Sequence, residues 1–129
     1  MRCFQLVDIA RRYLTDDTEV ECLDSRHAFS VENSIIILTK GVLKEESTWF
    51  IELLRGKCNI ILGDFVDDPP ARELLRQLDG VVAASISQYL ACKKDPNCMS
   101  SYLVTHPVDP RLPVCNKVME RCRIGYFGE

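Results

Sequence analysis

Apolar residues along this chain follow two alternating kinds of pattern. In the first kind, apolar residues recur three and four positions apart, which is typical of a helix with one buried face. In the second kind, a short run of consecutive residues is apolar and rich in isoleucine or valine, which is typical of a strand buried on both faces. The helical pattern covers residues 2–14, 45–55, 69–78 and 87–94. The strand pattern covers residues 34–39, 58–62 and 81–84.

The order of these elements predicts the fold class. Strands that alternate with helices form parallel sheets with helices on the faces, because parallel neighbours need a long crossover connection. We therefore expect an α/β protein with three layers and a mostly parallel sheet, of the flavodoxin-like kind. This domain is expected to cover residues 1–106, followed by a proline-containing linker and a short helix over residues 107–129.

Three other segments have weaker patterns. Residues 19–23 alternate polar and apolar side chains, which predicts a short strand. Residues 25–33 form a polar connection with room for one helical turn. Residues 101–105 (SYLVT) have the β-propensity of a fourth parallel strand, but their apolar side chains also fall on one side of a helix. Both interpretations of this last segment stay open.

Composition places the chain among ordinary globular proteins. Its 129 residues are 47% hydrophobic and 27% charged, with a net charge of −3. Such values argue against disorder and against a basic surface for nucleic acid. The longest apolar run, residues 35–38, is too short to cross a bilayer, and the first residues lack the apolar block of a secretory signal. We therefore expect a cytoplasmic protein with no membrane contact.

The seven cysteines do not form any C-x-x-C pair. Zinc sites usually need two closely spaced cysteine pairs, so we expect no bound metal. Cys3 and Cys58 fall within apolar patterns, where a free cysteine behaves as a small hydrophobe. The sequence therefore predicts reduced thiols, as is usual in the cytosol.

Polar residues follow the predicted strands, at the end of the sheet where ligands bind in open α/β folds. Asp64, Asp67 and Asp68 follow the second strand, while Ser85 and His106 follow the third strand and residues 101–105. The three carboxylates have the oxygen ligands that magnesium prefers. The alternative is that they are turn residues, with Asp68 capping the helix that begins at two prolines. Ser85 or Ser87 is likewise a candidate cap for the helix that follows.

Motifs of common enzymes are absent from the sequence. Neither of the glycine-rich phosphate loops, G-x-G-x-x-G and G-x-x-x-x-G-K-[ST], occurs, and there is no G-x-S-x-G nucleophile motif. We therefore expect no nucleotide cofactor and assign no catalytic residue.

Short segments of the chain carry a resemblance to a known family. They are residues 34–38 (SIIIL), 79–82 (DGVV), 101–106 (SYLVTH) and 122–125 (CRIG). In these segments and in its order of elements, the chain resembles the degenerate, CsgD-like receiver domains of LuxR/FixJ-type bacterial transcriptional regulators. The resemblance begins after the first receiver strand and ends within the first helix of the DNA-binding domain.

The resemblance implies a domain that is not phosphorylated. The phosphoacceptor aspartate of a receiver falls on Thr39, which cannot form an acyl phosphate, and the receiver lysine falls near Ala84. The acidic pair that binds magnesium has no counterpart. Residues 101–106 would be helical under this reading. Direct DNA binding is not expected, because a helix-turn-helix needs a second, recognition helix.

Two functions follow as hypotheses. The first is a catalytically silent, receiver-like regulatory module that acts by self-association, as a homo-oligomer, or by binding a transcription factor. A sheet without its first strand would expose an edge, either at residues 19–23 or at the strand next to the absent one, and such an edge invites pairing with another chain. The alternative is a small α/β enzyme or ligand-binding protein that uses the acidic loop with Ser85 and His106.

Overall fold

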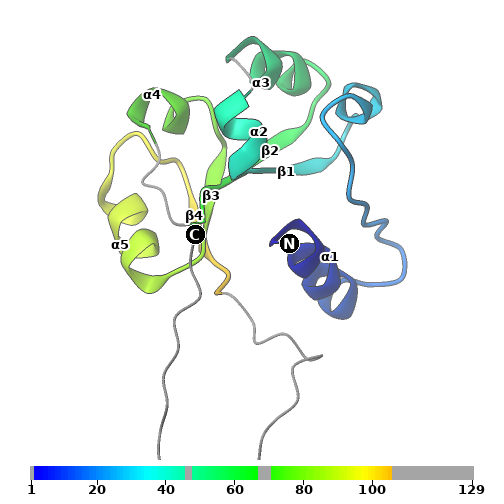
Figure 1. Ribbon diagram of the computed structural model, residues 1–129, viewed down its shortest axis with the longest axis horizontal. Coiled ribbons are helices and arrows are strands. Elements are labelled where there is room, and N and C mark those ends of the chain that lie inside the picture. The colour runs from blue at the N-terminus through cyan, green and yellow to red at the C-terminus, as the bar shows by residue number, and fades with distance from the viewer. Residues whose placement is uncertain (1, 46–47, 67–70, 106–129) are drawn as a thin grey trace, which may run out of the picture.

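The computed structural model describes residues 2–45, 48–66 and 71–105 of the chain. These residues form a sheet of four parallel strands, whose order in space is their order along the chain (Figure 1). The strands are β1 (Ile35–Thr39), β2 (Ile60–Asp64), β3 (Gly80–Ala83) and β4 (Ser101–Leu103). The α/β class and the parallel sheet predicted from the sequence are confirmed.

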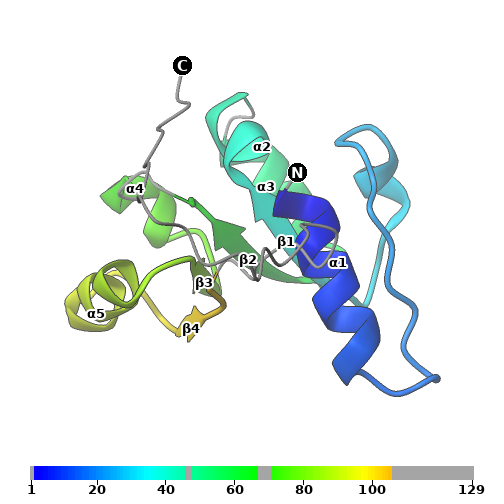
Figure 2. The same cartoon turned by 60° about the horizontal axis from the view of Figure 1, so that its bottom comes forward.

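Helices lie on both sides of this sheet. They are α1 (Arg2–Tyr13), α2 (Lys40–Glu45), α3 (Thr48–Arg55), α4 (Arg72–Leu75) and α5 (Ile86–Lys94), with the 3-10 helix η1 (His27–Ser30). In both views, α2 and α3 lie on one side of β1 and α1 lies on the other (Figures 1 and 2). The linker and helix expected over residues 107–129 lie outside the described residues.

One face of the sheet carries the hydrophobic core. Leu38, Ile61 and Val81 come from three neighbouring strands and are at most 5% exposed. They belong to one cluster with Phe50 and Leu54 of α3 and with buried residues of α4 and α5. Full burial of an apolar side chain of this size contributes about 1.5–3 kcal/mol. The helices that connect the strands therefore derive their stability from this one face.

The opposite face is open at β1 and β2. Ile35 is 66% exposed, Ile37 39% and Ile60 50%. The expectation that both strands are buried on two faces is therefore wrong. The physical reason is that β1 is an edge strand and its crossover helices cover only the core face. In contrast, β3 is buried at all four positions, as predicted.

Two of the weaker segments differ in their outcome. Residues 19–23 are not a strand, because an alternating pattern needs a neighbouring backbone and none of the described strands pairs with it. Residues Ser101–Leu103 do form a strand, and backbone hydrogen bonds to β3 continue past both of its ends. The strand interpretation of SYLVT is confirmed, and the helix implied by the receiver resemblance is wrong at this segment. The helical turn considered for residues 25–33 is present as η1.

A buried asparagine aligns the amino ends of the first two strands. Asn59 is 5% exposed, and its Oδ1 accepts a hydrogen bond from the Ser34 N–H at 2.9 Å. Its Nδ2 donates to the carbonyl oxygens of Val31 and Leu54, each at 2.9 Å. Because buried polar groups are costly unless they are satisfied, this set of bonds favours one register of β1 on β2.

Replacing Gly63 tests the close packing of the core face. A Cβ at Gly63 would lie 2.6 Å from Leu78 Cδ1 and 2.9 Å from Phe65 Cε2, both in buried side chains. We expect Gly63→Ala to lower the free energy of unfolding by about 1–3 kcal/mol through overpacking. The matched control is Gly41→Ala, because a Cβ there has nothing within 4 Å and the position is helical. Urea unfolding should show the control to be neutral or slightly stabilised. Equal stability of the two variants would contradict this packing.

Candidate functional site

The carboxyl ends of the strands bring together two of the residues singled out in the sequence. Thr39 ends β1 and Asp64 ends β2, and the two are partners in the pairing register. Ser85 follows β3 by two residues. Asp67, Asp68 and His106 lie outside the described residues, so the structure does not test their place in an acidic loop.

Neither Asp64 nor Ser85 presents a free ligand to solvent. Asp64 is fully buried, and its Oδ1 accepts a hydrogen bond from the Val66 N–H at 3.3 Å. The Ser85 hydroxyl is the N-cap of α5, because its Oγ accepts from the Gln88 N–H at 3.2 Å. The cap predicted at Ser85 is confirmed. In the part of the chain that the structure describes, no three His, Cys, Asp or Glu side chains are close enough to hold a metal ion.

The helix after β2 begins later than predicted. Its first residue is Arg72, and Ala71 is at the N-cap position without a side-chain hydrogen bond. The predicted cap, Asp68, is among the residues that are not described. Val66, which follows β2, has a φ of 57°. This left-handed conformation is unfavourable for a β-branched residue, so the surrounding structure must stabilise it.

A cleft of about 470 Å³ runs along β1. All five residues of β1 line it, together with residues from the chain between Glu19 and Ser25 and from η1. Because β1 pairs only with β2 among the described strands, the cleft lies against an unpaired strand edge. Sequence patterns did not reveal this cleft, since it depends on residues 19–25 remaining outside the sheet.

The wall of the cleft is acidic. Among the described residues that line it, four are acidic and none is a lysine or an arginine; the acidic ones are Glu19, Glu21, Asp24 and Glu32. The His27 backbone N–H and then the His27 ring hydrogen-bond Asp24 and hold the pKa of this carboxyl below its usual range. The sequence did contain one indication of this acidic wall. Glu19 and Glu21 are two positions apart in the alternating pattern of residues 19–23, so an extended chain places both on one side.

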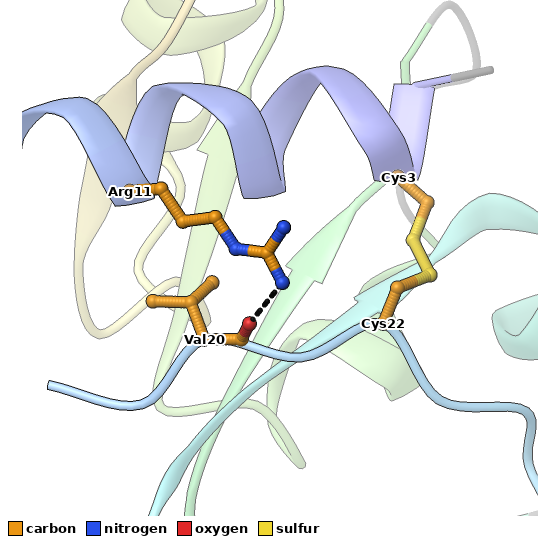
Figure 3. The surroundings of a disulfide bond; sticks show 4 residues. All are labelled: Cys3, Arg11, Val20 and Cys22. Atoms are coloured by element: carbon orange, nitrogen blue, oxygen red, sulfur yellow. Dashed lines mark hydrogen bonds between the residues drawn. A yellow bond between two sulfur atoms is a disulfide. The ribbon is translucent and has the colours of Figure 1, made fainter.

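Two contacts tether the acidic wall to α1. Cys3 and Cys22 form a disulfide, and the Arg11 guanidinium donates to the Val20 carbonyl oxygen at 2.8 Å (Figure 3). These contacts restrict the movement of residues 19–25, which do not pair with any of the described strands.

The disulfide corrects the expectation that all cysteines are reduced. Pairing among seven cysteines cannot be deduced from their spacing alone, so the sequence could not identify Cys3 and Cys22 as partners. Cys58 is a free thiol but is exposed, so its expected role as a small buried hydrophobe is also wrong. It lies outside the core because β2 begins only at Ile60.

The fold and the cleft define a parallel α/β protein with an acidic groove along an edge strand. Comparison of the chain with known protein families, curated proteins and solved structures finds no significant match. Within residues 2–45, 48–66 and 71–105, no helix has the length and apolar character needed to cross a bilayer.

Proposed function

We propose that this chain is a catalytically silent, receiver-like regulatory module that binds an extended segment of a partner protein along the outer edge of β1. The observation that carries the proposal is the unpaired edge of β1 inside the acidic cleft. Addition of a peptide strand to an open sheet edge is a common mode of protein recognition.

The backbone of β1 has hydrogen-bonding groups available at this edge. The Ile60 N–H donates to the Ser34 carbonyl oxygen at 2.9 Å. Since backbone groups alternate in direction along a strand, the amides of Ile36 and Leu38 point toward β2. The amides of Ile35 and Ile37 then point outward, into the cleft, where an added strand could accept their hydrogen bonds.

The strand order supports the receiver-like part of the proposal. In the flavodoxin-like order 2-1-3-4-5, strands three, four and five are consecutive neighbours, as β1, β2 and β3 are here. The outer neighbour of strand three in that order is strand one, which corresponds to the open edge of β1. The fourth strand, β4, departs from the receiver pattern.

The lining of the cleft defines the chemistry of the partner segment. Ile35 and Ile37 provide apolar contact, and the four carboxylates of the wall favour positive charge. A segment that alternates apolar and basic residues matches both. Pairing of β1 with β1 of a second copy would bring two acidic walls together, which is unfavourable. The charge therefore favours a regulator protein with a basic segment over a homo-oligomer.

The alternative function, an enzyme or ligand-binding protein, has one observation in its favour. Thr39 and Asp64 are neighbours at the strand ends, and Val66 beside them has strained backbone. The burial of Asp64 opposes this function, because its carboxylate does not reach solvent. The expected cytoplasmic location is opposed by the Cys3–Cys22 disulfide, because disulfides persist mainly in oxidising compartments.

Binding of short peptides tests the strand-addition proposal. We expect a peptide of alternating lysine and valine to bind, as measured by calorimetry at low salt, and a peptide of alternating glutamate and valine not to bind. The double variant Glu19→Gln/Glu21→Gln should weaken binding by about two- to thirtyfold, because each exposed charge contributes about 0.2–1 kcal/mol. Glu73→Gln in α4, outside the cleft, is the matched control and should bind like the parent.

Two further outcomes decide between partners. Methylation of the backbone nitrogens of the lysine–valine peptide should abolish binding if main-chain hydrogen bonds hold it. Light scattering of the chain alone should give a monomer. Binding that ignores peptide charge would contradict the acidic-cleft argument, and a stable dimer that excludes the peptide would favour self-association instead.

Treatment with acetyl phosphate tests whether the module is silent. Thr39 stands at the phosphoacceptor position that the receiver resemblance implies, and a hydroxyl cannot form an acyl phosphate. We expect the intact mass to be unchanged, while a receiver domain with its aspartate, treated in parallel, gains a phosphoryl group. A stoichiometric gain by this chain would refute the silent assignment.

A further inference from the structure

A compact turn folds Cys98 back onto the end of α5. The Asp95 N–H closes the helix by donating to the carbonyl oxygens of Ala91 and Cys92. The Cys98 N–H then donates to the Asp95 carbonyl oxygen at 3.1 Å, across Pro96 and Asn97. The Asp95 carboxylate holds the turn, because Oδ1 accepts from the backbone N–H of Asn97 at 2.9 Å and from its side-chain amide at 2.8 Å.

This turn places two free thiols in the same part of the core. Cys98 packs against the buried cluster that contains Cys92, and its Sγ donates to the Ser100 carbonyl oxygen at 3.2 Å. The two thiols lie near enough for each to affect the pKa of the other. Cys92 is 3% exposed, whereas Cys98 is half-buried. Neither thiol lines the β1 cleft or takes part in the disulfide of α1.

We propose that Cys92 and Cys98 are an oxidation site, at which a low-molecular-weight disulfide converts the two thiols into a second intrachain disulfide. Two features select this pair. Both thiols pack into the same cluster at the end of α5, and the hydrogen bonds of the Asp95 turn hold Cys98 beside that helix, so closure needs no rearrangement of the sheet. The exposed thiol of Cys58 has no such partner among the cysteines described as free.

The reaction proceeds by two thiol–disulfide exchanges. The Cys98 thiolate, which is the more accessible, attacks one sulfur of the oxidant, forms a mixed disulfide and releases the first reduced thiol. The Cys92 sulfur then attacks Cys98 Sγ, closes the Cys92–Cys98 bond and releases the second. The protein loses two hydrogens and two electrons, and the oxidant gains them as two thiols.

Burial sets the pH dependence of this reaction. Burial raises the pKa of the Cys92 thiol to about 11 and also raises that of Cys98. Asp95 is the acidic neighbour of both thiols, and its negative charge raises both pKa values further. Since thiolates are the reactive species, oxidation should be slow near neutral pH and faster at higher pH.

The bond would connect α5 to the segment that leads into β4. β4 has three residues, lies at the edge of the sheet and pairs only with β3 among the described strands. α5 and β4 are in contact in the folded chain (Figure 1). A Cys92–Cys98 disulfide would therefore restrain the far edge of the sheet, opposite to β1.

Peptide mapping of the native full chain tests the proposal. The protein is incubated with oxidised glutathione, its remaining thiols are blocked with N-ethylmaleimide, and it is digested with trypsin. Cleavage at Lys93 and Lys94 separates the two cysteines, so the disulfide appears as a cross-linked pair of peptides. We expect this pair to form, and to form faster at a pH one unit higher.

Variants and controls give the result that would overturn the proposal. Cys58→Ser should leave the cross-link intact, and Cys98→Ser should abolish it while Cys92 stays a free thiol. The parent protein needs no substitution, so a folding defect in a variant does not remove the test. Recovery of Cys92 and Cys98 as free thiols, as unresolved glutathione adducts or in bonds to other cysteines would refute the proposal.

Discussion

One-sided burial of β1 and β2 is the constraint on which the rest of this structure depends. The strands follow one another in space in the order of the sequence, and crossovers between parallel strands are almost always right-handed. Successive right-handed crossovers in one direction place their helices on the same face. Residues of α3, α4 and α5 accordingly share a single core with the strands. The crossover helices do not cover the opposite face of β1 or the outer edge of that strand.

α1 and residues 19–25 approach this open region without closing it. Their attachment includes a disulfide and a hydrogen bond from an arginine, and among the described residues no strand pairing joins them. An edge strand with unpaired backbone groups tends to pair with other chains unless charged residues or a covering segment prevent it. The acidic wall lines this edge, and the apolar side chains of Ile35 and Ile37 are exposed beside it. Under the proposed function, the same charges that oppose pairing with a second copy would favour a basic partner.

The sequence predicted the elements whose pattern reflects local chemistry. The β-branched runs became β1, β2 and β3, and Ser85 caps α5 through its own hydroxyl. The sequence predictions were wrong where strand pairing or burial depends on residues that are distant in the sequence. Residues 19–23 have a strand pattern but no partner, and the exposure of Ile35 depends on which face the helices cover.

Other features of the site were beyond the reach of sequence patterns. The Cys3–Cys22 bond depends on where α1 lies, and the role of Asn59 depends on three backbone groups that only the fold brings together. The acidic residues were visible individually, but their common position on one cleft was not. The receiver resemblance rested on short apolar segments, and the helix that it implied is a strand over Ser101–Leu103, because such segments suit either element.

Amide hydrogen exchange along β1, measured by NMR on the isolated monomeric chain, tests the open edge most directly. An edge strand paired on one side only should show alternating protection. The amides of Ile36 and Leu38, which point toward β2, should exchange slowly, and those of Ile35 and Ile37 should exchange rapidly. Strong protection of all four amides would mean that the outer edge of β1 is already paired, and would contradict the account.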